Sequence, residues 1–371
     1  MGININEVLE DWRERYIFRE GFVFTAGDSD FKRFDTLVIR SPKRAKGDVC
    51  GLGFSERTLE EHIRLVNEYP IEKVLIISDN IDFIQECPGI KELTVYPAYG
   101  SPKPFDYTGL YKMLNLQAVC CMTGNDESRD LLATIDYSKI SGLEEVALVG
   151  DGHVGYRDIP TLKRIWMSGN KKLTSFSDVS RSPVLEEATL IECGIKNLEG
   201  LDKCPQLAHL SLWYNRALRD ISGIAAAAES LREFDMEGCP RVHDFDALKY
   251  LKHLKALYLS GGNTLANLDF MRNMKELLLI DLQMKVVDGD LTNCLSVPYA
   301  DCRNFRHNNL KDKDLPKHVE AYHEYKAGRR IIPLQKFLYE LSVANNGIWQ
   351  NPSLGKGPFP KAVSFRDKEN P

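Results

Sequence analysis

Between residues 187 and 301, acidic residues recur next to the apolar positions of short segments in which apolar and other residues alternate. Alternation of apolar and other residues predicts a strand with one buried face, so these side chains would share the exposed face of a sheet. The acids at these positions are Glu187, Glu192, Glu233, Asp235, Glu237, Glu276, Asp281 and Asp301. No lysine or arginine occupies an equivalent position. The chemistry open to such a set is non-covalent, because carboxylates attract and orient a basic surface.

The same face is expected to carry aromatic side chains, which supply apolar contact area at binding sites. They are Trp213, Tyr214, Tyr258 and Tyr299, with Trp166 one segment upstream and His209 nearby. Aromatic residues beside charges of one sign are typical of a protein-binding hot spot. The predicted partner-binding residues are Trp166, His209, Trp213, Tyr214, Glu233, Asp235, Glu237, Tyr258 and Asp281. The alternative is that the acids keep an exposed sheet soluble while the aromatic residues pack along neighbouring strands.

Residues that could support catalysis or hold a metal ion lack the required spacing. The nine cysteines are scattered and odd in number, which favours structural thiols over a nucleophile or a disulfide framework. No two histidines have the spacing of metal ligands. The segment 51–55 precedes a predicted helix but lacks the third glycine of a dinucleotide fingerprint and the Gly-Lys-Ser/Thr of a phosphate-binding loop. We therefore expect no catalytic residues, no metal and no cofactor.

Composition limits the classes of partner. The chain has 371 residues, a formal net charge of -5 and an isoelectric point near 6.0, whereas a general polyanion binder would be strongly basic. Nucleic acid is therefore an unlikely partner, and a short basic cluster at 40–46 is interpreted as a solvated loop. No apolar run approaches the roughly 20 residues of a membrane helix. The N-terminus has no recognisable secretory signal. With the unpaired cysteines, these features predict a cytoplasmic protein that does not bind membranes.

A repeat organises the middle of the chain. The segment from Leu207 to Asn215 reads L-x-x-L-x-L-x-x-N, and other segments fit the same frame, with cysteine at the last position in two of them. The copies begin at residues 71, 90, 116, 143, 162, 185, 207, 231, 254, 274 and 295. The mean period is about 22 residues, and a repeat of this length cannot bury its apolar face alone. The elements that hold the acids and aromatic residues are therefore strands of stacked coils.

This frame resembles the leucine-rich-repeat family, most of all its short bacterial internalin-like type. The resemblance covers residues 71 to about 310. It is supported by the family's I-x-x-L/I-x-x-L/I pattern, which runs from Ile195 to Leu201 and from Leu218 to Ile224. It implies an α/β fold, in which a curved solenoid of about eleven coils carries a parallel sheet on its concave face. The asparagine that ends a frame is expected to bind backbone groups of the turn and of the neighbouring coil. Cys193 and Cys239 are small, soft residues that suit the same buried position.

The two ends depart from the frame. Residues 1–70 are expected to form an N-terminal cap or small α/β region, with a helix over 6–19, a strand over 34–40 and a helix from a capping box at Thr58 and Glu61 to about residue 69. Residues 311–345 are expected to form a helical C-terminal cap with helices over 315–325 and 334–341, the second having an apolar face. Residues 346–371 are expected to form a flexible tail.

Together these observations favour one elongated domain that binds a basic protein or peptide through an acidic, aromatic concave face and has no catalytic activity. Three alternatives remain open. The chain could be an immunity-type protein that neutralises a toxin, or an effector that binds proteins of a host cell. It could also have an enzymatic or ligand-binding activity in the N-terminal 70 residues, although no nucleophile–base pair or metal set is found there.

Overall fold

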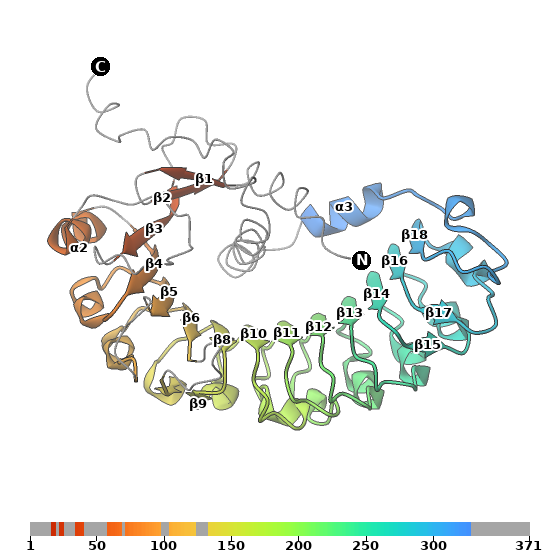
Figure 1. Ribbon diagram of the computed structural model, residues 1–371, viewed down its shortest axis with the longest axis horizontal. Helices are drawn as coiled ribbons and strands as arrows, with labels where there is room; N and C mark the ends of the chain where they lie inside the picture. Colours follow the sequence, from red (N-terminus) through yellow and green to blue (C-terminus); the bar gives the residue numbers. More distant parts are fainter. Residues whose placement is uncertain are drawn as a thin grey trace, which may run out of the picture.

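A long curved sheet is the main feature of the computed structural model, which describes residues 16–19, 22–25, 34–40, 58–68, 71–97, 104–123 and 133–327. Fourteen strands form this sheet, and their order in space follows their order along the chain. The strands are β1 (Tyr16–Arg19), β2 (Phe22–Thr25), β3 (Phe34–Arg40), β4 (Lys73–Ser78), β5 (Glu92–Pro97), β6 (Ala118–Met122), β8 (Glu145–Val149), β10 (Arg164–Ser168), β11 (Glu187–Ile191), β12 (His209–Trp213), β13 (Glu233–Glu237), β14 (Ala256–Ser260), β16 (Leu279–Leu282) and β18 (Tyr299–Cys302). Figure 1 shows them on the inner side of an arc.

From β4 to β18, short 3₁₀ helices return the chain from each strand of the long sheet to the next along the outer side of the arc (Figure 1). They are η1 (Asp82–Glu86), η2 (Thr108–Lys112), η3 (Tyr137–Lys139), η4 (Tyr156–Asp158), η5 (Phe176–Asp178), η6 (Leu201–Lys203), η7 (Ser222–Ala227), η8 (Asp246–Tyr250), η9 (Asp269–Asn273) and η10 (Thr292–Ser296). Two small parallel pairs accompany them, β7 (Ile135–Asp136) with β9 (His153–Val154) and β15 (Thr264–Leu265) with β17 (Lys285–Val286). The sheet curves because the outer side of each coil is bulkier than the strand.

The leucines of the frame form the core between the two sides. Leu210 pairs in register with Phe234, and Leu212 pairs with Met236, so that equivalent apolar residues of successive coils lie side by side. All four side chains are buried. Eleven parallel strands, from β4 to β18, correspond to the eleven predicted coils. The predicted leucine-rich-repeat architecture is therefore confirmed.

The asparagine at the end of the frame ties neighbouring coils together. Asn215 is buried, its side-chain amide donates to the Leu190 carbonyl at 2.8 Å, and its side-chain oxygen accepts from the Cys193 amide at 2.8 Å. Cys239, which holds the same position one coil later, is buried with its thiol 3.4 Å from the Leu212 carbonyl. The expected hydrogen bonds of the asparagine and the expected burial of the cysteine are thus confirmed, and both side chains contact backbone carbonyl groups of the core.

The last two coils begin at different residues from those that the sequence predicts. Leu257 pairs with Ile280, and Leu259 pairs with Leu282, so the tenth frame begins at Leu277 instead of residue 274. The eleventh likewise begins at 297 instead of 295. The prediction was wrong because residues 277–280 are all apolar and fit the frame in two registers. The correction removes Glu276 from the concave face and places Arg303 at a position that the sequence analysis treated as free of basic residues.

The N-terminal region extends the sheet. Strand β3 pairs in parallel with β4, while β1 and β2 form an antiparallel hairpin beside it. Helix α2 (Leu59–Glu68) connects β3 to β4. It begins with the predicted capping box, in which the Thr58 amide donates to the Glu61 carboxylate at 2.7 Å and the Glu61 amide donates to the Thr58 hydroxyl at 3.2 Å. The strand at 34–40 is confirmed. The helix expected over 6–19 is wrong at residues 16–19, which form β1, and its remainder lies outside the described residues.

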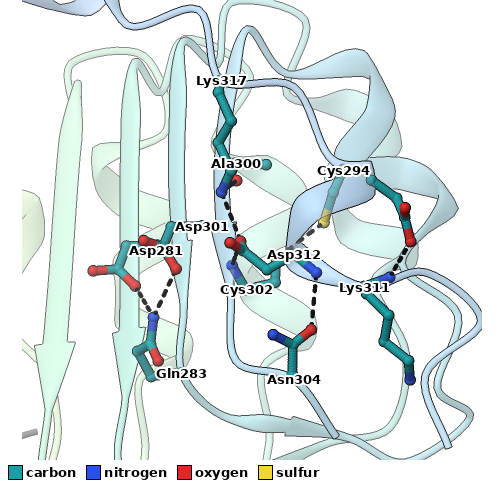
Figure 2. A network of polar contacts seen from close by, with 11 residues as sticks. Asp281, Gln283, Cys294, Ala300, Asp301, Cys302, Asn304, Lys311, Asp312 and Lys317 are labelled. Carbon is teal, nitrogen blue, oxygen red and sulfur yellow. Dashed lines mark hydrogen bonds and ion pairs between the residues drawn. The ribbon is translucent and has the colours of Figure 1, made fainter.

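The C-terminal end closes the open edge of β18. The Ala300 amide donates to the Pro316 carbonyl at 3.0 Å. The Asp312 carboxylate accepts from both the Cys302 amide and the Lys317 ammonium group (Figure 2). The 3₁₀ helix η11 (Asp312–Asp314) lies in this segment, and helix α3 (Glu320–Ala327) follows it. The predicted helix over 315–325 therefore begins at residue 320. The segments 334–341 and 346–371 lie outside the described residues.

Candidate concave binding face

Alternation along the strands places every second side chain on the concave side of the sheet. In β12 and β13 the leucine positions are buried, whereas Ser211, Trp213, Asp235 and Glu237 are partly accessible. The register sets Ser211 beside Asp235 and Trp213 beside Glu237. The structure thus brings together the predicted residues of these two coils. They lie on one continuous surface, at the spacing of about 4.8 Å between neighbouring strands.

Trp213 and Asp235 form the best-defined contact of this surface. The indole Nε1 of Trp213 donates to Oδ2 of Asp235 at 2.8 Å, across from one coil to the next. An indole has one donor and no acceptor, so an acid on the neighbouring strand fixes the orientation of its ring. The ring is therefore held in place before any partner arrives, which lowers the entropic cost of using it as a contact surface.

Tyr214 repeats this arrangement at the end of the strand. Its hydroxyl donates to Glu237 of the next coil, and its side chain is 42% exposed. Its φ is +56°, whereas Gly238 holds the equivalent left-handed position one coil later. A Cβ at Gly238 would lie 2.5 Å from the Tyr214 ring, so glycine leaves the space in which the ring lies. A tyrosine in this conformation costs about 1 kcal/mol, and the equivalent residue one coil earlier, Glu192, shares it with a φ of +50°.

Two acids of this surface, Asp235 and Asp281, have a raised pKa. Burial, followed by the charges of Glu237, Asp281 and Glu233, raises the pKa of Asp235 from 3.8 to about 7, although the Trp213 hydrogen bond opposes the shift. The pKa of Asp281 is raised as well, first by burial and then by Asp301 and Glu237. A carboxyl group whose neutral form is favoured by burial and by like charges loses its proton more readily when a cation approaches. The surface is therefore suited to positively charged ligands.

The C-terminal side of the concave face is partly covered by α3. The Tyr258 hydroxyl is hydrogen-bonded to that of Tyr322, which is buried against Ala256 and Leu279. Figure 1 shows α3 on the inner side of the arc. On the neighbouring strands β16 and β18, Asp281 and Asp301 both accept from the Gln283 amide, at 2.6 Å and 3.3 Å (Figure 2). The predicted residue Tyr258 thus lies under the helix, and Asp281 lies beside Gln283.

The remaining predicted residues lie near the same surface. His209 of β12 lies with its Nδ1 3.9 Å from a Glu233 carboxylate oxygen, and both are largely buried. Trp166 is partly accessible on β10, with β11 between it and β12. The sequence analysis missed Ser211, which lies between the predicted residues, and Arg303 on the last coil. The repeat frame could have identified both, because each holds a concave position once the register is known.

The first coils have a different, apolar concave face. Strand β4 is buried on both sides, and its concave residues Leu75 and Ile77 are 1% and 6% exposed. This surface continues on β6 and β8, where Cys120 and Ala147 are buried and pair with each other in register. The hydroxyl of Thr94, on β5 between them, is buried with no hydrogen-bond partner in the part of the chain that is described. The continuous apolar run in β4 was the available signal, since it departs from alternation.

The described cysteines and histidines have structural surroundings. Burial raises the pKa of the thiols of Cys120 and Cys193 to about 12, which makes them poor nucleophiles. His153 is buried between Thr123 and the Tyr137 hydroxyl, each 3.0 Å away, and burial lowers its pKa to about 4. Among the described residues there is no group of three or more potential metal ligands, and no helix is long and apolar enough to span a membrane.

Several solved structures are similar to this chain. An internalin from Listeria monocytogenes has 14% sequence identity and a TM-score of 0.49, over 73% of this chain and 83% of that one. A leucine-rich-repeat protein from Leptospira interrogans has 12% identity and a TM-score of 0.30, over 68% and 82%. Mouse RP105, solved with MD-1, has 12% identity and a TM-score of 0.38, over 71% and 43%. No protein-family model matches the chain, and no curated protein matches it.

The identification of the fold depends on the chain's own repeat. Parallel strands recur about every 22 residues, their leucines pair in register, and 3₁₀ helices return along the outer side. Buried asparagine and cysteine side chains bind the backbone at the turn of each frame. These features identify the chain as a leucine-rich-repeat solenoid.

Proposed function

We propose that this chain is a non-catalytic binding module whose concave face, between β11 and β16, holds a basic protein or peptide. The observation that carries the proposal is the pair of contacts in which Trp213 and Tyr214 each donate to an acid of the next coil, Asp235 and Glu237. Each contact sets an aromatic ring beside a carboxylate on an accessible surface. A lysine or arginine can use both, since its charge meets the acid and its stem or guanidinium plane packs on the ring.

The electrostatics of the site favour a cation over a neutral ligand. The raised pKa of Asp235 comes first from burial, and the charges of Glu237, Asp281 and Glu233 add repulsion to it. A cationic group between Asp235 and Glu237 would relieve that repulsion. It would also stabilise the deprotonated form of Asp235. Binding should therefore release a proton near neutral pH, and should weaken as salt is added.

We further propose that the module works in the cytoplasm. All eight described cysteines are free and buried. Burial raises the pKa of most of these thiols. For Cys87 and Cys204 the raised pKa is about 11. Buried thiols without disulfide partners suit a reducing compartment. The same inert thiols support a role in binding and not in catalysis, because a cysteine nucleophile needs an accessible thiolate.

The proposal can be tested with the full chain and a fluorescent nona-arginine peptide, followed by anisotropy. We expect Glu237→Lys to weaken binding by about tenfold, which corresponds to about 1.4 kcal/mol. The control is Glu229→Lys, which makes the same change in net charge at a side chain that is 82% exposed near the end of η7. A nona-glutamate peptide should not bind. Equal weakening by both substitutions would mean that only the net charge attracts the peptide, and would contradict a site on the concave face.

Natural partners can then be sought by affinity capture from a cell lysate, with wild-type protein and Glu237→Lys compared by quantitative mass spectrometry. A basic protein that is enriched only by the wild type would identify the partner. If every enriched protein is retained equally by both forms, the concave acids are not the binding site. A partner co-produced as a toxin would assign the module to immunity, whereas a general scaffold would capture partners of other kinds.

A further inference from the structure

The chain itself approaches the concave face from its C-terminal side. Lys317 pairs with Tyr299 of β18, and five residues later Tyr322 contacts Tyr258 of β14, two strands further along the sheet. Helix α3 therefore runs from the last coil toward the first. It ends at Ala327, and the next strand in that direction is β13, which carries Asp235 and Glu237. The last described residue, Ala327, lies five residues beyond Tyr322, which contacts the strand next to the acidic surface.

The charge of the remaining chain is opposite to that of the face. Residues 328–371 contain seven basic residues and three acids, a net charge of +4, so residues 1–327 carry -9 of the total of -5. The basic residues are Arg329, Arg330, Lys336, Lys356, Lys361, Arg366 and Lys368. Two of them, Arg329 and Arg330, come directly after α3. Arginine is well suited to this surface, because its guanidinium group binds carboxylates in a bidentate manner and stacks on aromatic rings.

Apolar residues follow these arginines, and an apolar surface follows the acids. Leu334, Phe337, Leu338 and Leu341 have the spacing of one helix face. Beyond β13, the concave side changes to the apolar surface of Leu75, Cys120 and Ala147, all of which are at most 6% exposed. A sheet face buried in this way requires a cover. The buried hydroxyl of Thr94, which has no hydrogen-bond partner among the described residues, would be satisfied by a polar group in that cover.

The length of the segment is sufficient. From β14 to β4 the sheet contains eight spacings, about 40 Å. The 44 residues after Ala327 would span about 66 Å even if they were fully helical. The segment can therefore reach every coil of the concave face. Its order of basic and then apolar residues matches the order of the acidic and apolar surfaces that it would meet.

We propose that residues 328–371 bind the concave face of their own chain, with Arg329 and Arg330 at the acids of β13 and the apolar residues on the first coils. The bound segment occupies the surface that the proposed function assigns to a basic partner, and in this respect the inference rests on that function. A partner must displace the segment, which makes the segment an intramolecular competitor. Its attachment to the same chain gives it a high effective concentration at the site.

Disulfide trapping in the full chain tests this proposal without any partner. Ser211→Cys places a thiol on the concave side of β12 beside Asp235. Ile331→Cys places a second thiol directly after Arg329 and Arg330, which are left unchanged. Under mild copper–phenanthroline oxidation we expect rapid formation of a link within one chain, identified by mass spectrometry of the linked peptides. The control pairs Ile331→Cys with Ser222→Cys, an exposed position on η7 at the outer side of the arc, and should link far more slowly.

Charge reversal separates docking from chance encounters. Adding Glu237→Lys to the Ser211→Cys/Ile331→Cys pair should slow the link by about tenfold, whereas Glu229→Lys should leave its rate nearly unchanged. Equal rates for the concave and outer pairs, or no effect of Glu237→Lys, would overturn the proposal. A link that forms only between chains, and faster at higher concentration, would also overturn it and would indicate that a second copy occupies the face.

The competition has its own readout. Full-length Arg329→Glu/Arg330→Glu should bind nona-arginine about tenfold more tightly than wild type. The control is Arg241→Glu/Lys249→Glu, which makes the same change in net charge at exposed residues before and within η8. If trapping succeeds but no form binds nona-arginine, the segment docks and the proposed function fails. If nona-arginine binds while trapping fails, the proposed function stands and the intramolecular segment is excluded.

Discussion

Asp235 should make the stability of this protein depend on pH in an unusual direction. Its carboxyl group keeps its proton in the folded protein up to about pH 7, whereas in the unfolded chain it loses the proton near 3.8. Between these values the folded state binds more protons than the unfolded state. The free energy of unfolding that this group contributes therefore falls as pH rises through this window, and is constant above it.

The substitution Asp235→Asn removes this dependence while keeping an oxygen that can accept from the Trp213 indole. One unit of pKa corresponds to about 1.4 kcal/mol, so wild type should lose at most about 3 kcal/mol between about pH 5 and about pH 8 relative to the variant. This loss of free energy is an upper limit, because Asp235 is not fully buried and solvent screens part of the repulsion. The variant should be similar in stability to wild type at about pH 5, and more stable at about pH 8.

Unfolding by urea at the two pH values, followed by fluorescence and circular dichroism, measures the difference. The matched control is Asp246→Asn, an exposed residue in the first turn of η8 on the outer side, which should alter stability by the same amount at both pH values. Parallel pH profiles for wild type and Asp235→Asn would refute the reasoning. They would mean that Asp235 is charged in the folded protein and that the concave acids do not repel one another appreciably.

Three further changes test other parts of the structure. Asn215→Ala leaves the buried Leu190 carbonyl and Cys193 amide without their partner and should lower the free energy of unfolding by about 2–4 kcal/mol, measured by urea unfolding. Tyr214→Gly exchanges a strained φ of +56° for a residue that adopts it readily, so stability should change by less than about 1 kcal/mol while nona-arginine binding weakens. The eight described cysteines are buried, so iodoacetamide should modify them only after unfolding, as mass spectrometry of the labelled peptides would show.

Most of the fold could be predicted from the sequence, because its repeat is strong. The frame that begins at Leu207 fixes which side of a five-residue strand is buried, and stacking then fixes the neighbours of each strand. The prediction failed where this local signal was ambiguous. Residues 277–280 are all apolar, so the frame could be placed in two registers, and only pairing with β14 selects between them. Likewise, the strand at 34–40 was recognised, but its parallel pairing with β4 was not, because α2 and a long connection separate the two strands.

The candidate site was predicted in outline, and its chemistry was not. Alternation was enough to place Trp213 and Asp235 on the exposed side of neighbouring strands. The hydrogen bond between them, and the raised pKa that burial and three neighbouring acids produce, depend on side chains from different coils. The position of α3 over Tyr258 is also a contact between residues 64 positions apart, which no local pattern specifies. A repeat predicts which residues share a face, but the protonation and accessibility of those residues follow only from the assembled sheet.

The two halves of the concave face imply a requirement for any ligand that covers it. Near β13 a cation would offset the negative charge of the acids, whereas on β4 to β8 an apolar group would cover Leu75 and Ala147. A purely basic ligand would leave the apolar half exposed to water, and a purely apolar ligand would bury the charges of the acidic half without a partner. Either outcome costs free energy. The ligand that binds most tightly should therefore be bipartite, with basic residues toward β14 and apolar residues toward β4. Residues 328–371 have this order, and a partner that displaces them must match both halves or bind one of them considerably more tightly.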